Sequence, residues 1–315
     1  MRDRDALTQS YPWLARHDAP ERLIMGDDLD AALSTVLYLH THPRAELVGV
    51  YRGYERVTFA AQCDWAALLG GLWLDLDIYD ARCRSLGHHI VRHTAEDVLP
   101  GFANSCNLNE LYGRSVTRHF RWKYPLGTVH FLMWLYGCDV RPQTDAELLI
   151  WLADSTYING QSHRFRRNVE AWLREVVPLP GLLAGFAALD APAFEARMSA
   201  FQERLAGRGF APGKGQVRSR HLGLSGFQCQ PGPEDDPVLY LRKLLLYCAN
   251  VTGWHFNLQQ LDGFRPPVQE LVGRRRRCAV HTLGDDGLAA FLERERVFSY
   301  VFTHRQTLNY TQDLG

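Results

Sequence analysis

Residues 22–40 read RLIMGDDLDAALSTVLYLH, and this stretch predicts the class of the fold. Its first four residues predict a short apolar strand, which ends in an acidic cluster at residues 27–30. Residues 31–40 have helical composition, and residues 45–51, which read AELVGVY, predict a second strand. A strand, a helix and another strand in this order favour a parallel sheet that is covered by helices.

The same alternation continues along the first half of the chain. A third, buried strand is predicted at residues 72–77, which read LWLDLD, and helices are predicted at residues 124–136 and 145–153, the second with Thr144 as its N-cap. Beyond residues 178–180 we expect helices over 182–205 and 239–251 and a strand-like segment over 297–310. The predicted fold is α/β, with a mostly parallel sheet flanked by helices at residues 1–177 and a second, smaller α+β domain at residues 178–315.

The composition is that of an ordinary globular protein without net charge. The 35 Lys and Arg residues balance 35 Asp and Glu residues, which argues against binding DNA by bulk positive charge but permits local basic patches. The chain shows neither an apolar run of transmembrane length nor a signal-peptide pattern, so no membrane partner is expected. Seven cysteines without a CxxC pair read as buried thiols in a reducing compartment, which predicts a cytoplasmic location.

Acidic residues and histidines follow the apolar segments in a regular order. Asp75 and Asp77 alternate within the third predicted strand, so both are expected on one side of the sheet, where carboxylates are costly unless they are paired or bound to metal. Ligands of parallel sheets bind at the carboxyl ends of the strands, and a mixed Asp and His set suits Mn²⁺ or a similar ion. The predicted set is Asp28, Asp30, Asp75, Asp77, His88, His89 and Asp154.

Each motif alone also has a plainer interpretation. An acidic cluster after a strand is most often a solvated loop or a helix N-cap, and a His-His pair is more often a surface or core feature than a ligand pair. The order of the motifs along the chain is what favours a metal site. Such a site with two metal ions can hold a phosphate and generate hydroxide.

This ordered series resembles the DHH phosphoesterase family, which is named for its Asp-His-His motif. Residues 28–34, which read DLDAALS, resemble the first family motif, and Asp75 or Asp77 resembles the Asp that ends a buried strand in the second. Residues 87–89, which read GHH, represent the third motif, and residues 152–155, which read LADS, the fourth. The loop with Asn107 and Asn109 looks like the Asn-rich loop of the family, so the resemblance covers about residues 20–170.

The chain departs from the family at three small residues. Gly87 replaces the Asp of the third motif, Gly26 stands where many members have a His or Asp ligand, and Ala31 replaces the usual Gly. Asp27, or whichever of Asp75 and Asp77 is not otherwise used, is a candidate to supply the missing coordination. Alternatively, metal binding at this site is weakened or lost.

The resemblance implies a Mn²⁺-dependent phosphodiesterase, with Mg²⁺ as the alternative metal, that uses two ions. Asp28, Asp30, Asp75, Asp77, His88 and Asp154 would hold the ions, and His89 and Asp154 would be catalytic. The expected activity is that of a nuclease on single-stranded or short nucleic acid. The alternatives are a weakened member that binds a nucleotide or a partner, and a hydrolase of pyrophosphate or cyclic dinucleotides.

An anionic substrate also needs positive charge around the acidic centre. Basic stretches at residues 163–167 and 274–277 have aromatic or apolar neighbours and suit a phosphate backbone, although such runs are often only solvated faces. The predicted substrate-binding residues are Asn107, Asn109, Arg164, Arg166, Arg167, Arg275 and Arg276.

Overall fold

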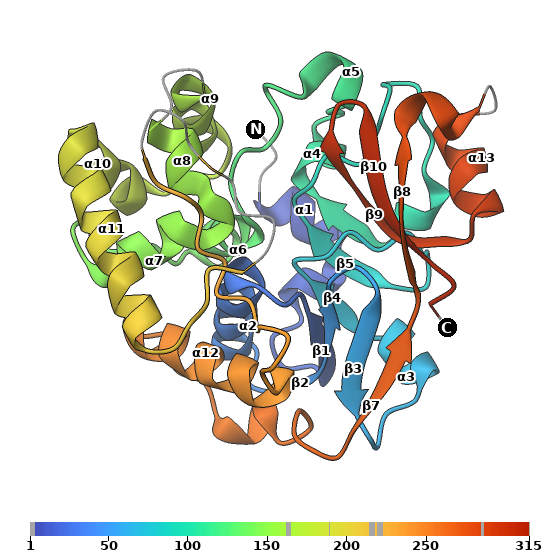
Figure 1. Cartoon of the computed structure of the whole chain (residues 1–315), viewed down its shortest axis with the longest axis horizontal. Coiled ribbons are helices and arrows are strands. Elements are labelled where there is room, and N and C mark those ends of the chain that lie inside the picture. Colours follow the sequence, from blue (N-terminus) through green and yellow to red (C-terminus); the bar gives the residue numbers. More distant parts are fainter. Residues whose placement is uncertain are drawn as a thin grey trace. The chain divides into compact units, whose positions relative to one another are not determined.

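The computed structural model describes residues 4–161, 165–188, 190–213, 218, 223–284 and 287–314. They form an α/β protein, as the sequence predicts (Figure 1). The chain divides into two compact units. A helical unit combines Met1–Asp18, Asp27–Pro43 and Pro125–Leu258, and a sheet unit combines Ala19–Gly26, Arg44–Tyr124 and Gln259–Gly315. The predicted boundary near residue 178 lies inside the helical unit, because the chain passes between the units several times.

The sheet unit holds a seven-stranded sheet in the part of the chain that the structure describes. Its strands are β1 (Glu21–Met25), β2 (Ala45–Arg52), β3 (Arg56–Ala60), β4 (Leu72–Leu74), β5 (Arg84–Gly87), β6 (Ser105–Asn107) and β7 (Val268–Val272). Their order is β6-β5-β4-β1-β2-β3-β7. The strands β6, β5, β4, β1 and β2 pair in parallel, whereas β3 pairs antiparallel with both β2 and β7. Because β1 pairs with β2 on one side and β4 on the other, the strand order reverses between β1 and β4, which is where open α/β sheets bind ligands.

The third predicted strand is wrong at its end. β4 stops at Leu74, and Asp75 adopts a left-handed backbone conformation with φ of 59°. Asp75 and Asp77 are therefore loop residues, and the alternation of a strand does not place them. The partners β5 and β6 have only four and three residues, which is too short for an alternating pattern to be recognised.

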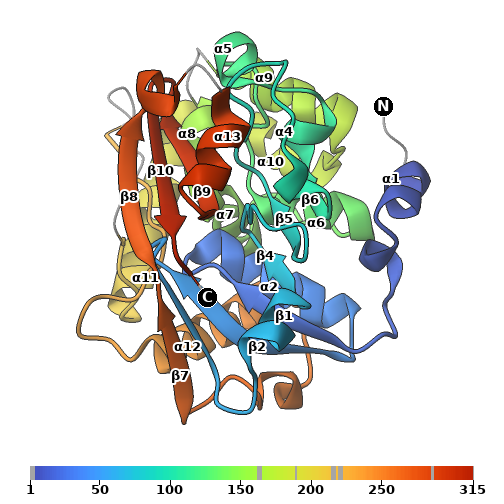
Figure 2. The same ribbon diagram turned by 90° about the vertical axis from the view of Figure 1, so that its right-hand side faces the viewer.

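A small antiparallel sheet is formed by the C-terminal part of the same unit. Its strands are β8 (Arg274–Ala279), β9 (Val297–His304) and β10 (Thr307–Gln312), in the order β8-β10-β9 (Figure 2). The predicted segment 297–310 is thus a hairpin, and with the helix α13 (Gly287–Arg294) it gives the C-terminal part its predicted α+β character. The remaining helices of the unit are α3 (Trp65–Leu69), α4 (Leu108–Leu111) and α5 (Val116–His119), with 3-10 turns at Pro100–Phe102 and Val280–Leu283.

Aromatic side chains join the two sheets of this unit. The fully buried Trp73 of β4 lies 5.3 Å, between ring centroids, from Phe298 of β9. The hydroxyl of Tyr51 on β2 is within 2.7 Å of Ser299 Oγ and also hydrogen-bonds Thr311 Oγ1. Buried polar groups are stable only when they are paired, so these bonds fix how the small sheet lies on the large one.

The helical unit consists of helices and short turns in its described residues. Its α-helices are α1 (Arg4–Ser10), α2 (Leu29–Thr41), α6 (Thr128–Tyr136), α7 (Asp145–Leu152), α8 (Thr156–Gln161), α9 (Arg166–Ala171), α10 (Pro180–Ala188), α11 (Ala191–Gly207) and α12 (Pro237–Thr252). Shorter turns are the 3-10 turns Pro12–Ala15 and Ala153–Ser155 and a π-helical turn at Trp172–Val176, while the 3-10 turn Leu258–Leu261 begins at the end of this unit.

The centre of the helical unit is α2. Its residues 29–39 are all buried, and it packs against α6 and α12. A helix with apolar residues on all sides is stable only inside a protein. The predicted N-cap Thr144 is confirmed, because its Oγ1 accepts a hydrogen bond from Glu147 N at 3.2 Å. Among the described residues, every helix is too short or too polar to cross a bilayer.

His42, after the end of α2, makes the stability of the helical unit dependent on pH. Its fully buried ring stacks on Tyr38 at 3.8 Å, and burial followed by the nearby His17 lowers the pKa of His42 to about 4. The unfolded chain, with an ordinary pKa near 6.5, then binds a proton that the folded chain excludes, so stability falls as the pH falls from 6.5 to 4. We expect a loss of about 3 kcal/mol over this range, because folding lowers the pKa of His42 from 6.5 to about 4.

Urea unfolding of wild type and His42→Phe at pH 7.5, 5.5 and 4 measures this loss. Phe preserves the ring stack but does not titrate, so the variant should lose less stability than wild type on acidification. Substitution of the exposed His304 by Phe serves as a control and should leave the slope unchanged. Identical slopes for wild type and His42→Phe would contradict the prediction.

Candidate metal centre

Polar side chains gather where β4, β5 and β6 of the sheet unit end. Leu74 pairs with Leu86, and Gly87 pairs with Asn107, so these parallel strands stop nearly in step. Asp75 follows β4, His88 follows β5, and Asn107 is the last residue of β6, so all three lie at one edge of the sheet. The sequence prediction that they share a sheet edge rested on this rule of parallel sheets.

Asp75 and His88 form a buried pair at this edge. Asp75 Oδ1 lies 3.0 Å from His88 Nδ1, and their side chains are only 5% and 7% exposed. A carboxylate at this distance favours the tautomer with the proton on Nδ1, which leaves the lone pair of the ring on Nε2. Metal-binding histidines are typically oriented by a carboxylate in this way.

A second pair, Asp77 and His89, lies beside the first. Asp77 Oδ2 accepts a hydrogen bond from His89 N at 3.2 Å and lies 3.1 Å from His89 Nδ1. The rings of His88 and His89 are 4.3 Å apart. The side chain of His89 is 29% exposed, whereas Asp77 is 4% exposed, so His89 is the member of the two pairs that solvent reaches best.

Gly87 creates the space that Asp77 occupies. A Cβ atom on residue 87 would lie 2.1 Å from Asp77 Oδ1 and 2.4 Å from its Cγ, distances that no real structure tolerates. The carboxylate of Asp77 therefore fills the volume into which a side chain at position 87 would extend. This is the position at which the DHH resemblance expects an Asp.

Asn107 and Asn109 order the loops around the two pairs. Asn107 Nδ2 donates to Asp77 Oδ1 at 2.6 Å and to His89 O at 2.8 Å. Asn109 Nδ2 donates to His88 O at 2.7 Å. Both amides were predicted to bind substrate. In this structure they hold the backbone and carboxylates of the candidate ligands, a role that sequence reasoning missed.

The helical unit carries acidic residues of its own at the start of α2. Asp28 caps the helix, because its Oδ1 accepts a hydrogen bond from Ala31 N at 3.1 Å. Burial, followed by the carboxylates of Asp154, Asp30 and Asp27, raises the pKa of Asp28, and the hydrogen bond from Ala31 opposes this shift. Carboxylates that crowd one another need a proton or a cation to be stable together.

Asp30 has a structural role within this set. Its two oxygens accept hydrogen bonds from Thr128 N at 2.7 Å and Val129 N at 2.9 Å, at the N-terminus of α6. A carboxylate at this position satisfies two unpaired N–H groups of the helix and interacts favourably with its dipole. Gly127 leaves room for it, since a Cβ there would lie 2.3 Å from Asp30 Oδ2.

Asp154 sits at a strained turn between α7 and α8. Asp154 and Ser155 have φ values of 51° and 54°, a left-handed conformation that costs on the order of 1 kcal/mol for each residue with a side chain. Asp75 in the sheet unit has the same kind of backbone. Such backbone outliers concentrate at functional sites, and Asp75 and Asp154 are both candidate ligands.

The predicted arginines are distributed over several elements. Arg164 lies outside the described residues. Arg166 pairs with Glu170 at 2.9 Å and lies over the ring of Phe186, and Arg167 is exposed on α9. Arg275 and Arg276 are exposed on the edge strand β8, where Arg276 Nε donates to Gln312 Oε1 at 3.2 Å.

Comparisons with known proteins return no match: no family model fits the chain, and neither the curated proteins nor the solved structures contain a similar one.

Proposed function

We propose that the chain is a Mn²⁺-dependent phosphodiesterase of the DHH type that hydrolyses single-stranded or short nucleic acid with two metal ions. The observation that carries this proposal is the double Asp–His pair, Asp75 with His88 and Asp77 with His89, at the carboxyl edge of the parallel strands. This edge adjoins the point between β1 and β4 where the strand order reverses, which is the usual place for a ligand of an open α/β sheet.

The donor set fits the proposed metal. Carboxylate oxygens suit Mn²⁺ and Mg²⁺, while imidazole nitrogens favour transition metals, so a mixture of the two favours Mn²⁺ over Mg²⁺. When bound, two such ions orient a phosphate and make water a nucleophile near neutral pH. In this proposal Asp75 orients His88, and His89, the more exposed imidazole, contacts the phosphate oxygens.

The position of Asp77 supports an active rather than a weakened site. The family's Asp is absent at Gly87, but the carboxylate of Asp77 lies directly over this glycine and is held there by Asn107. We infer that Asp77 replaces the missing side chain. The resemblance assigns Asp28, Asp30 and Asp154 of the helical unit to the same ions.

The proposal is tested with metal-free protein and a small generic phosphodiester, bis(p-nitrophenyl) phosphate. We expect Mn²⁺ to start hydrolysis, Mg²⁺ to support it less well, and equilibrium dialysis to count two Mn²⁺ ions per chain. Asp154→Asn should lower the rate about 100-fold or more, a loss typical of metal sites and transition-state contacts. Comparing an oligonucleotide with pyrophosphate and a cyclic dinucleotide then identifies the substrate class.

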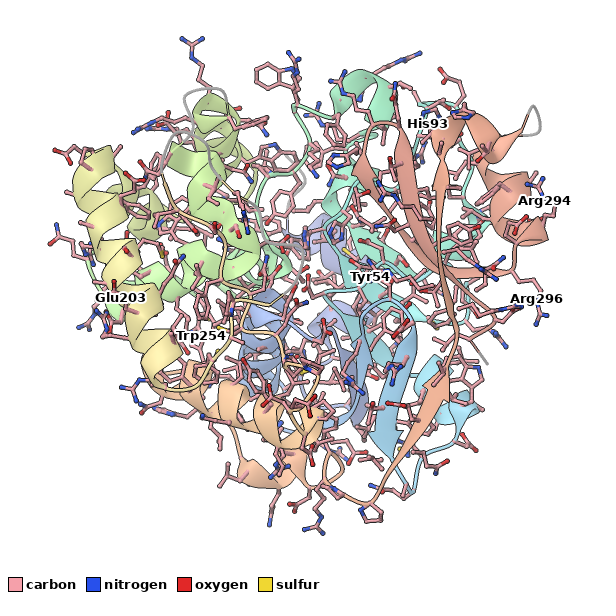
Figure 3. The ribbon with its side chains drawn as sticks, viewed as in Figure 1. Tyr54, His93, Glu203, Trp254, Arg294 and Arg296 are labelled. Atoms are coloured by element: carbon pink, nitrogen blue, oxygen red, sulfur yellow. The ribbon has the colours of Figure 1, made fainter. Side chains whose placement is uncertain are left out.

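The control is Glu203→Gln, which removes an exposed carboxylate from α11 (Figure 3). Its rate should equal that of wild type. Hydrolysis that persists in EDTA, or an Asp154→Asn variant with the wild-type rate, would remove the assignment.

A further inference from the structure

A basic and aromatic loop of the sheet unit begins and ends at one residue of the candidate centre. Arg114 N donates to Asn109 O, and Tyr124 N donates to Asn109 Oδ1, both at 2.8 Å. The same Asn109 holds His88 O through its Nδ2. Residues 110–124, which we call the Asn109 loop, are therefore fixed at both ends to the residue that supports His88.

The Asn109 loop is also ordered along its length. Val116 N donates to Arg92 O at 2.9 Å and Thr117 N donates to His93 O at 3.0 Å, so α5 is attached to the segment that follows His89. The ring of His93 in turn stacks on Phe302 of β9, with 6.0 Å between the centroids (Figure 3). A loop held at this many points presents its exposed side chains in a defined arrangement, which lowers the entropy lost on binding.

Most of this loop carries only positive charges. Residues 113–124 read GRSVTRHFRWKY and contain four Arg and Lys residues without any Asp or Glu. Arg118 pairs with Glu96 at 2.8 Å, but both side chains are more than 60% exposed, so this pair is weak. Arg121 is exposed and has no ion-pair partner among the residues that the structure describes.

Two cationic side chains contact the ring of Phe120. Lys123 Nζ lies 5.2 Å from the centroid of its ring, and Arg305, from the turn between β9 and β10, lies 5.6 Å from it. Each of these cation–π contacts is favourable, but together they bring two like charges to one ring. A phosphate that binds near Phe120 would be attracted to both cations.

Trp122 adds an open aromatic surface beside these charges. It is 55% exposed, which is unusual for so large an aromatic side chain, and it lies between Arg121 and Lys123 in the sequence. Trp122 N donates to His119 O at 2.7 Å, so its backbone is fixed. Alternating aromatic and basic side chains are the pattern with which proteins bind unpaired bases and their phosphates.

We propose that the Asn109 loop and the β9–β10 turn form a binding surface for single-stranded nucleic acid, on which a base stacks on Trp122 and phosphates contact Arg121, Lys123 and Arg305. This inference deepens the proposed function and rests on it. A single strand fits better than a duplex, because the faces of paired bases are not available for stacking. Inorganic phosphates would use the cations but leave Trp122 without a partner.

The experiment measures binding of a fluorescently labelled twelve-nucleotide oligothymidylate in EDTA by fluorescence anisotropy. Trp122→Leu, which preserves apolar volume but lacks a π-face, should weaken binding about tenfold or more, and Trp122→Phe should restore most of the affinity. Arg121→Ala should weaken binding and reduce the slope of log K against log salt concentration by about 0.7. Arg174→Ala, at an exposed position of the π-helical turn, is the charge-matched control and should bind like wild type.

Equal affinity of Trp122→Leu and wild type would overturn the inference, and so would equal binding of a duplex of the same length. Because EDTA removes any metal, the outcome is separate from that of the proposed function. Trp122-dependent binding without Mn²⁺-dependent hydrolysis would support the nucleic-acid surface and contradict the proposed phosphodiesterase activity. Hydrolysis of bis(p-nitrophenyl) phosphate together with Trp122-independent binding would support the phosphodiesterase activity and contradict the nucleic-acid surface.

Discussion

Asp75→Asn is expected to lower Mn²⁺-dependent hydrolysis by about 10- to 100-fold while the protein remains folded. Asp75 Oδ1 accepts the Nδ1 proton of His88 over 3.0 Å, and a neutral amide at this place binds that proton less strongly. If the amide instead presents its NH₂ group, the proton of His88 moves to Nε2 and the lone pair is lost from that nitrogen. Carboxylates that orient metal-binding histidines typically contribute 10- to 100-fold in affinity or activity.

The backbone makes Asn the informative substitution. Asp75 has φ of 59°, and Asn is among the few residues with a side chain that adopt this left-handed conformation readily. A change to Ala would add backbone strain, so its effect on the rate would mix two causes. The Tm of Asp75→Asn should therefore lie close to that of wild type, and isothermal titration with Mn²⁺ should show weakened binding.

A double variant separates a shared function from two independent effects. If Asp75 acts through His88, Asp75→Asn combined with His88→Gln should be about as slow as the slower single variant, because groups that act as a unit are not additive. If the fold-losses of the two single variants multiply in the double variant, Asp75 acts on the reaction independently of His88. A wild-type rate for Asp75→Asn would exclude the pair from the metal centre.

Elements with long and regular patterns could be predicted from the sequence. β1, α2 and β2 were each found where the sequence places them. The apolar run of β1 is short, but the long helical pattern that follows it directly makes it recognisable. β5 and β6 were missed, because three or four residues carry no periodicity. The division into two units was not predictable either, since it depends on contacts between segments far apart in the chain.

The candidate site shows the same limit at the level of single residues. Asp75 and Asp77 were placed together by an alternation that the structure does not contain; their histidine partners, twelve and thirteen positions later in the sequence, position them instead. Asp30 was predicted as a ligand from its motif, and this stays a prediction; the structure adds that its carboxylate caps a helix 98 residues further along the chain. The basic side chains of the Asn109 loop are recognisable in the sequence, whereas the exposure of Trp122 required the fold.

Gly87→Ala is expected to abolish most of the proposed hydrolysis even though it adds only one methyl group. The new Cβ would lie 2.1 Å from Asp77 Oδ1, and this carboxylate cannot move away without breaking its bonds to Asn107 and His89. We expect a loss of hydrolysis of about 100-fold and a destabilisation of about 1–3 kcal/mol, as for other overpacked sites. Gly207→Ala is the matched control, because a Cβ at this residue of α11 meets nothing within 4 Å.

The decisive comparison exchanges the two side chains. If Asp77 replaces the carboxylate that Gly87 lacks, Gly87→Asp alone should inactivate the protein by overcrowding, whereas Gly87→Asp together with Asp77→Gly should recover part of the activity and of the Mn²⁺ affinity. The exchange moves one carboxylate along the sheet edge and leaves the number of charges unchanged. Rates of hydrolysis and Mn²⁺ titrations of wild type, Gly87→Asp, Asp77→Gly and the double variant measure this recovery. A double variant no better than Gly87→Asp would mean that the position of Asp77 matters only for packing.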